Sequence, residues 1–191
     1  MFWKKRRKQT ATQTRGVTIW LTGLSGAGKT TIGQAVVTRL NELEVPSTLL
    51  DSDSLRLGLC ADLGYDEEDR AENVRRVAEV AALMRTAGIC PVVALMSPYK
   101  EGRDLARYRS SSRFIEVYVD TPLAVCRERD PKGLYDLYAA GRLKNLSGVD
   151  LPYEVPQMPE ITIRTEHTPV PAAVAQIVDA VASLRQQPIS A

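Results

Sequence analysis

The sequence predicts an α/β fold in which one parallel β-sheet is covered by helices on both faces. Its 191 residues are the usual length of one compact domain. Short apolar runs alternate with longer segments of helical periodicity, and the first run ends at a glycine-rich turn that opens a helix. Alternating strands and helices are typical of parallel sheets, in which each helix carries the chain back to start the next strand. Ligands of such sheets bind at the carboxyl ends of the strands.

The first half of the chain begins with a strand, a helix and a second strand. Residues 17–21 are β-branched, aromatic and apolar, as expected of a strand. Residues 30–43 then carry apolar side chains at helical spacing. Pro46 separates this helix from a short strand at 48–50, which ends at Asp51. This strand therefore delivers a carboxylate to the ligand-binding edge of the sheet.

A long helix and two further strands follow. Residues 68–86 place apolar side chains on one helix face, and Gly88 ends that helix. Residues 92–96 are apolar on both faces, which is typical of a buried parallel strand. Residues 114–119 form another strand. The pattern is that of repeated β–α units.

The last part of the chain contains a long interruption before one more strand and helix. Residues 161–163 read as a strand, and Pro171 opens a helix with an apolar stripe. Residues 130–159 contain several glycines and prolines, few periodic apolar residues, and more chain than an ordinary connection. A surface excursion is one interpretation. We favour a lid over an active site, because the segment joins two strands at the ligand-binding edge.

The charge of the chain is concentrated at its start. Six of the 25 basic residues and no acidic residue lie in residues 1–15, which leaves 19 basic against 23 acidic residues, or −4, in the remainder. We expect residues 1–15 to be a basic, solvated tail, with a weak contact to anionic surfaces as the lesser alternative. A mildly acidic body argues against nucleic acid as a partner.

The cysteines and the apolar segments indicate a cytoplasmic protein. Three isolated cysteines without a Cys-x-x-Cys pair are typical of a reduced protein with neither disulfides nor a zinc site. The segment after the basic cluster is polar where a signal peptide would be apolar. No stretch approaches the roughly 20 apolar residues of a membrane span.

A phosphate-binding loop is the strongest motif in the sequence. Residues 23–30, Gly-Leu-Ser-Gly-Ala-Gly-Lys-Thr, match Gly-x-x-x-x-Gly-Lys-[Ser/Thr] between a predicted strand and a predicted helix. The glycines allow backbone N–H groups to surround a phosphate, Lys29 reaches the β- and γ-phosphate oxygens, and Thr30 offers a hydroxyl to Mg²⁺. The ligand is therefore a nucleoside triphosphate.

Two aspartates favour a kinase over a GTP-binding switch. The chain lacks the Asn-Lys-x-Asp motif that reads guanine, whereas Asp51 and Asp53 follow the second strand. One carboxylate can hold magnesium or its waters while the other accepts the proton of an attacking hydroxyl. Capping of the next helix is an almost equally good interpretation of Asp51.

Three polar residues could clamp an anionic acceptor. Arg56 follows Asp53 by three residues, and Arg70 and Asn73 are spaced to share one face at the start of the helix predicted at 68–86. Alternatively, these arginines form a solvated face with ion pairs to the nearby glutamates 67, 68 and 72.

Later motifs, in the same order along the chain, resemble those of the adenylylsulfate kinase family. They are Gly23–Thr31, Leu50–Arg56, Leu63–Tyr65 with Asp69–Arg76, Ser97–Tyr99, Arg129–Tyr135 and Ser147–Glu154. The resemblance runs from about Gly16 to Val181 and implies a single P-loop kinase domain at 16–187 with a lid at about 130–159. It further implies transfer of the ATP γ-phosphoryl group to the 3′-hydroxyl of adenosine 5′-phosphosulfate, with Mg²⁺ and in a homodimer. The product would be 3′-phosphoadenosine 5′-phosphosulfate, the form in which activated sulfate is used.

The resemblance also implies roles for individual residues. The catalytic set would be Asp53 as base, Lys29 and Ser97, which matches a serine that descriptions of the family sometimes give as a phosphorylated intermediate. Magnesium would be held by Thr30 and Asp53. ATP would contact Gly23, Ser25, Gly26, Ala27, Gly28, Lys29, Thr30, Thr31, Arg129 and Lys132. The acceptor would contact Asp53, Arg56, Tyr65, Arg70, Asn73, Met96, Ser97, Lys144 and Leu146.

Two positions depart from the family pattern. Ser52 stands where the family usually has glycine between the aspartates, and Leu146 stands where an aromatic ring usually faces the adenine opposite Tyr65. Two alternative functions therefore remain open. One is a kinase of another small anionic hydroxyl compound, and the other is a nucleotide-dependent regulatory module.

Overall fold

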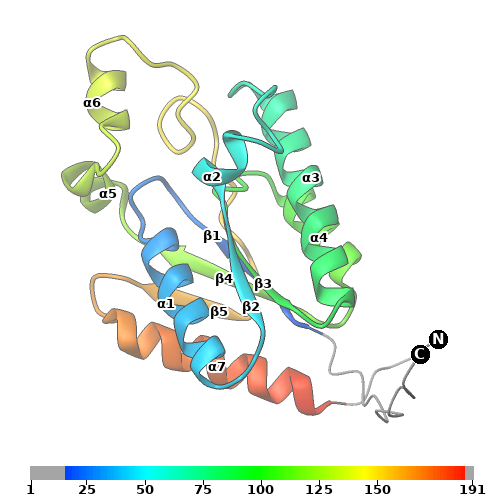
Figure 1. Cartoon of the computed structure of the whole chain (residues 1–191). Coiled ribbons are helices and arrows are strands. Elements are labelled where there is room, and N and C mark those ends of the chain that lie inside the picture. Colours follow the sequence, from blue (N-terminus) through cyan, green and yellow to red (C-terminus); the bar gives the residue numbers. More distant parts are fainter. Residues whose placement is uncertain (1–15, 188–191) are drawn as a thin grey trace.

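A computed structural model describes residues 16–187, whose five strands form one parallel sheet in the order β2-β3-β1-β4-β5 (Figure 1). All four strand pairings are parallel, and Trp20 at the centre pairs with Val93 on one side and Glu116 on the other. The predicted fold class is confirmed. The strands are β1 (Thr18–Thr22), β2 (Ser47–Asp51), β3 (Cys90–Ala94), β4 (Phe114–Asp120) and β5 (Ile161–Arg164).

Two pairs of long helices cover the two faces of the sheet. Helices α1 (Lys29–Glu42) and α7 (Val170–Gln186) pack together on one face, and α3 (Glu67–Thr86) and α4 (Lys100–Ser110) pack together on the other (Figure 1). Side chains of β1 alternate between the two cores. Ile19 and Leu21 belong to the core under α1 and α7, whereas Trp20 belongs to the core under α3 and α4.

Helix α4 was not predicted, because its buried face carries little apolar surface. That face consists of Arg103, Ala106 and Ser110, so the apolar stripe that marks other helices is missing. Two short helices also escaped prediction. They are α5 (Leu123–Arg129) and α6 (Leu134–Ala139), of which α6 lies inside the segment expected to be a lid. The helix that Asp51 was expected to cap is α2 (Ser52–Arg56).

The phosphate-binding loop joins β1 to α1 at the carboxyl edge of the sheet. Gly23 and Gly26 have φ angles of 149° and 75°, which favour glycine. A Cβ atom at Gly23 would lie 2.6 Å from the Val119 carbonyl oxygen, and one at Gly26 would lie 2.9 Å from that of Cys126. The motif glycines therefore allow the loop to pack directly against β4 and α5.

The structure bears on the membrane expectation but not on the one about the basic tail. Within residues 16–187, no helix combines the length and the apolar character that crossing a bilayer requires. The basic tail expected at residues 1–15 lies outside the described residues.

Candidate active site

A cavity of about 890 Å³ opens at the carboxyl edge of the sheet, where the phosphate-binding loop, α2, the start of α3 and the lid meet. It brings together every predicted site residue except Gly23. These residues are Ser25, Gly26, Ala27, Gly28, Lys29, Thr30, Thr31, Asp53, Arg56, Tyr65, Arg70, Asn73, Met96, Ser97, Arg129, Lys132, Lys144 and Leu146.

The Lys29 ammonium lies inside the phosphate-binding loop. Its Nζ donates hydrogen bonds to the carbonyl oxygens of Gly23 at 2.9 Å and Leu24 at 2.7 Å. Gly23 thus contributes to the site through its backbone rather than by lining the cavity. Burial lowers the pKa of Lys29 from 10.5 to about 8, and the positive charge of Lys132 adds to this effect. A phosphate placed here would supply the negative charge that Lys29 lacks.

Asp51 serves two purposes at the end of β2. Its Oδ1 accepts the backbone N–H of Asp53 at 3.0 Å and so caps α2, which confirms the capping interpretation. Its Oδ2 accepts the Thr30 hydroxyl at 2.8 Å. The sequence pointed to Thr30 and Asp53 as magnesium ligands, but the structure places Asp51 against Thr30.

The oxygen atoms of Thr30 and Asp51 fit a magnesium ion bound chiefly through phosphates. Among residues 16–187, no group of three or more His, Cys, Asp or Glu side chains could hold a metal. Mg²⁺ in kinases is usually bound by one or two protein oxygens together with substrate phosphates and water. A hydroxyl and a carboxylate beside a phosphate-binding loop meet that requirement.

Asp53 faces the lid. Its Oδ2 forms an ion pair with Lys132 Nζ at 2.5 Å, which joins α2 to the loop between α5 and α6. Both side chains are substantially exposed, so solvent screens the pair. The carboxylate is therefore held at the cavity by a contact that a more highly charged ligand of Lys132 can replace.

Two arginines and a tyrosine form the opposite wall. The Arg56 guanidinium lies 4.1 Å from the centre of the Tyr65 ring, and the Arg70 guanidinium lies 5.7 Å from it. Arg56 donates to the carbonyl oxygens of Leu63 and Gly64. Arg70 donates to those of Tyr65 at 2.8 Å and Asn145 at 2.7 Å, so it bridges α3 to the lid. Partial burial, together with the charge of Arg56, lowers the pKa of Arg70.

The contacts of Glu72 decide between a substrate clamp and a solvated face. Glu72 pairs with Arg75 and Arg76, which lower its pKa to about 2. Asn73 is 4% exposed, and its Oδ1 has no hydrogen-bond partner among the described residues. A buried acceptor at a cavity wall favours a bound ligand, since an unsatisfied buried polar atom is otherwise costly. The geometry thus favours the clamp.

The Ser97 hydroxyl is hydrogen-bonded within the protein. The side chain is 1% exposed, and its hydroxyl accepts a hydrogen bond from Trp20 Nε1 and donates one to Thr22 Oγ1, both at 3.0 Å. The hydroxyl is therefore occupied within the protein rather than presented to a phosphate. A φ of 40° marks Ser97 as a turn residue that shapes the loop after β3.

Leu146 lies in the lid close to the phosphate-binding loop. It is 4% exposed and packs with the core under α1 and α7, whereas Tyr65 is 56% exposed. Its N–H donates to Asp150 Oδ1 at 2.6 Å. A Cβ at Gly148 would lie 2.4 Å from the Leu24 side chain, so the lid touches the loop here. Leu146 is therefore a buried apolar part of the cavity wall, in place of the aromatic ring that the family pattern sets opposite Tyr65.

The chain after β5 supplies cavity residues that the motifs did not identify. Thr165, Thr168, Pro169 and Val170 line the cavity, and Arg129 donates to the Thr165 hydroxyl at 3.2 Å. No motif marks this segment. Its position just beyond the carboxyl end of a parallel strand is the signal that could have identified it.

Comparison with known proteins gives one consistent family. The family described as adenylylsulphate kinase matches residues 15–164. The adenylyl-sulfate kinases of Enterobacter sp. (strain 638) and Klebsiella pneumoniae (strain 342) are 49% and 50% identical to this chain over 166 residues, which are 86% of this chain and 82% of each relative.

Solved structures give the same result. The Mycobacterium tuberculosis APS kinase CysC, solved in complex with AMPPNP and APS, has a TM-score of 0.85 and 40% identity, covering 88% of this chain and 98% of that one. A gluconokinase from Sinorhizobium meliloti 1021 has a TM-score of 0.57 at 16% identity, covering 90% of this chain and 96% of that one, and shares the fold alone.

Proposed function

This chain belongs to the adenylylsulphate kinase family, and we propose that it transfers the γ-phosphoryl group of ATP to the 3′-hydroxyl of adenosine 5′-phosphosulfate. The products are ADP and 3′-phosphoadenosine 5′-phosphosulfate. The observation that carries the proposal is that one cavity contains both the phosphate-binding loop and the residues Arg56, Arg70 and Asn73. Asp53 lines the same cavity. The relative from M. tuberculosis, solved with AMPPNP and APS, supports the same pair of ligands.

ATP binds with its phosphates in the loop at 23–30. Lys29 turns from the carbonyl oxygens of Gly23 and Leu24 toward the β- and γ-phosphates, while backbone N–H groups at the start of α1 surround them. Thr30 and Asp51 would hold an accompanying Mg²⁺, which would supply positive charge beside the phosphates. Arg129 and the segment at 165–170 lie on the nucleoside side of the cavity.

Asp53 is the general base of the reaction. Its carboxylate accepts the proton of the acceptor's 3′-hydroxyl as that oxygen forms a bond to the γ-phosphorus. The bond from the γ-phosphorus to the β–γ bridging oxygen breaks, and ADP leaves with that oxygen. When ATP binds, Lys132 leaves its ion pair with Asp53 and pairs with the ATP phosphates, so the Asp53 carboxylate is free to accept the proton. Closure of the lid excludes water that would otherwise take the phosphoryl group.

The acceptor binds on the far side of Asp53. Arg56 and Arg70 pair with its phosphate and sulfate oxygens, and the unpaired Asn73 Oδ1 accepts a hydrogen bond from it. Tyr65 and Leu146 supply aromatic and apolar walls for adenine. Met96 and Ser97, at the end of β3, and Lys144, in the lid, also line this side and complete the contact set.

We further propose a location and an assembly for this chain. The free, buried cysteines 60, 90 and 126 support the cytoplasm as the location, since reduced thiols persist there. We expect a homodimer, and a relative from Thiobacillus denitrificans is described as hexameric. Light scattering coupled to size-exclusion chromatography measures the assembly directly.

A panel of acceptors tests the proposed substrate. ADP release from ATP is followed with adenosine 5′-phosphosulfate, AMP, gluconate, shikimate and adenosine, each at the same concentration. Turnover with adenosine 5′-phosphosulfate alone supports the proposal. Turnover with a sugar acid instead would assign another anionic acceptor, a possibility raised by Leu146, and ATP binding without any turnover would favour a regulatory module.

A further inference from the structure

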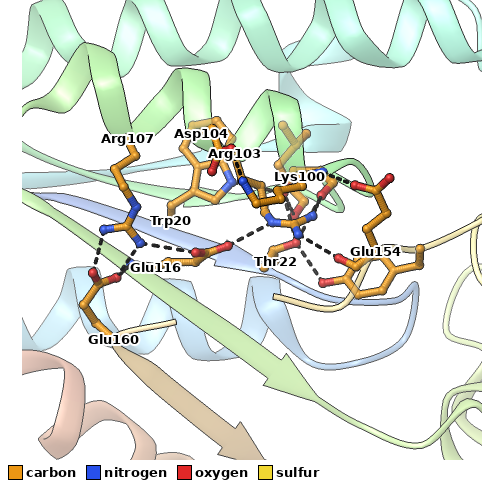
Figure 2. A network of polar contacts seen from close by, with 12 residues as sticks. Trp20, Thr22, Lys100, Arg103, Asp104, Arg107, Glu116, Glu154 and Glu160 are labelled. Atoms are coloured by element: carbon orange, nitrogen blue, oxygen red, sulfur yellow. Dashed lines mark hydrogen bonds and ion pairs between the residues drawn. The ribbon is translucent and has the colours of Figure 1, made fainter. Parts of the chain in front are cut away.

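A buried arginine outside the cavity joins three segments of the chain. Arg103, on α4, is 3% exposed, and its Nε pairs with Glu116 Oε1 on β4 at 2.9 Å. One terminal nitrogen donates to the Ser97 carbonyl oxygen at 2.8 Å, and the other donates to that of Glu154 at 2.7 Å. Figure 2 shows the guanidinium between Glu116 and Glu154.

Two of these partners belong to segments that border the reaction. Ser97 lies in the loop after β3 and lines the cavity, and Glu154 lies near the C-terminal end of the lid segment at 130–159. The N–H of Glu154 donates to the Pro98 carbonyl oxygen at 2.8 Å, and its carboxylate accepts the N–H of Lys100 at 2.5 Å. The end of the lid is thus fastened to the β3 loop at several points, with Arg103 between them.

The same corner reaches the start of the phosphate-binding loop. Tyr153, next to Glu154, shares a 2.9 Å hydrogen bond with Thr22, the residue before Gly23. The Thr22 hydroxyl donates to the Met96 carbonyl oxygen at 2.6 Å and accepts the Ser97 hydroxyl at 3.0 Å. The start of the phosphate-binding loop, the loop after β3 and the lid therefore meet beside Ser97 and Glu154, the two residues whose carbonyl groups Arg103 bonds.

The charge of Glu116 alone does not require Arg103. Arg107, one turn further along α4, pairs with Glu116 at 3.2 Å and with Glu160 at 2.5 Å (Figure 2). Arg107 is more exposed, with 37% of its side chain accessible, and its ion-pair partners Glu116 and Glu160 lie on neither the β3 loop nor the lid segment at 130–159. What Arg103 adds is a rigid fork with donors in several directions, which a lysine cannot reproduce.

We propose that Arg103 is a positioning residue for phosphoryl transfer, which sets the lid and the β3 loop at the separation that in-line transfer requires. The inference rests on the proposed function and extends it to α4, a helix that does not reach the cavity. A loosened lid admits water, so ATP is hydrolysed without acceptor. Displacement of reacting groups by about 1 Å can lower the rate on the order of 100-fold, even when the change is remote.

Arg103→Lys and its matched control Arg107→Lys test the proposal. Both variants keep a positive charge on α4 near Glu116, but only Arg103→Lys loses the hydrogen bonds to the carbonyl groups of Ser97 and Glu154. We expect Arg103→Lys to lower kcat/KM for adenosine 5′-phosphosulfate by roughly 10- to 100-fold. The ratio of ATP hydrolysed to phosphorylated acceptor formed should rise. Arg107→Lys should keep both quantities within about twofold of the parent, because a lysine keeps a positive charge beside Glu116 and Glu160, and these partners lie outside the β3 loop and the lid.

Hydrogen exchange separates the positioning role from a loss of stability and from the substrate assignment. In Arg103→Lys, amide exchange should increase at 96–99 and 143–158 but not in α1, whereas global destabilisation would raise exchange everywhere. Equal kinetics and equal exchange in the two variants would overturn the inference. Parent protein that shows no turnover with this acceptor would overturn the proposed function instead, and exchange would still decide the role of Arg103.

Discussion

The lowered pKa of Lys29 predicts that ATP binding takes up a proton. Burial inside the loop brings this pKa from 10.5 to about 8 in the protein without nucleotide. A phosphate against the ammonium favours its charged form and raises the pKa again. Above pH 8 the free protein has lost the Lys29 proton and the complex has regained it. ATP affinity should therefore fall as the pH rises through 8, and the ATP γ-phosphate, already ionised, does not obscure this change.

The size of the effect follows from the shift. At pH 9, one unit above the pKa, about one molecule in ten carries a charged Lys29, so ATP affinity should be about tenfold, or 1.4 kcal/mol, weaker than well below pH 8. The same group makes the free energy of unfolding of the free protein rise with pH between about 8 and 10.5, because the unfolded chain holds more protons there. The rise is about 3 kcal/mol, because each unit by which the pKa of Lys29 is lowered corresponds to about 1.4 kcal/mol.

Titration calorimetry in buffers of different ionisation enthalpy measures the proton directly. With Mg²⁺ and ATP, we expect uptake of about half a proton at pH 8 and close to one at pH 9. Lys29→Met should bind ATP weakly with no uptake in this range, while Lys144→Met, on the acceptor side, should keep it. Absence of uptake at pH 9 in the parent protein, or equal uptake in Lys29→Met, would refute the reasoning.

Four substitutions test the rest of the site. Asp53→Asn should lower kcat, measured in coupled assays, by roughly 10²–10⁴ with little change in ATP affinity. If Asp51→Asn lowers kcat more than Asp53→Asn does, Asp51 is the general base instead. Asn73→Ala should raise the acceptor KM about tenfold more than the ATP KM, because its Oδ1 is unpaired without ligand. Ser97→Ala should retain kcat within about tenfold, and rapid-quench labelling that showed phosphate on Ser97 would contradict this. Leu146→Phe should tighten acceptor binding about fivefold by calorimetry, and weaker binding would mean that the cavity is not shaped for adenine.

Local chemistry made the sheet and the phosphate-binding loop predictable. Residues 23–30 must wrap a phosphate with their own backbone, so their composition is constrained whatever surrounds them. Strands buried on both faces likewise carry their signal in a few consecutive residues. The joint position of Arg70 and Asn73 at the cavity was predictable because one helix turn separates them.

Features that depend on distant partners were not predictable in this way. Helix α4 was missed because Arg103 occupies its buried face, and an arginine is buried there only because Glu116 and two carbonyl groups surround it. The contact of Asp51 with Thr30 depends on how β2 and α1 meet. Residues 165–170 carry no motif, and their place at the cavity follows from sheet order.

Phosphorus NMR of the complete reaction tests the central claim most directly. With ATP, Mg²⁺ and adenosine 5′-phosphosulfate, we predict a new phosphomonoester resonance coupled to the ribose 3′-proton, formed in the same amount as ADP. ADP accompanied by inorganic phosphate instead, or a phosphate on any other acceptor position, would contradict transfer to the 3′-hydroxyl at this site.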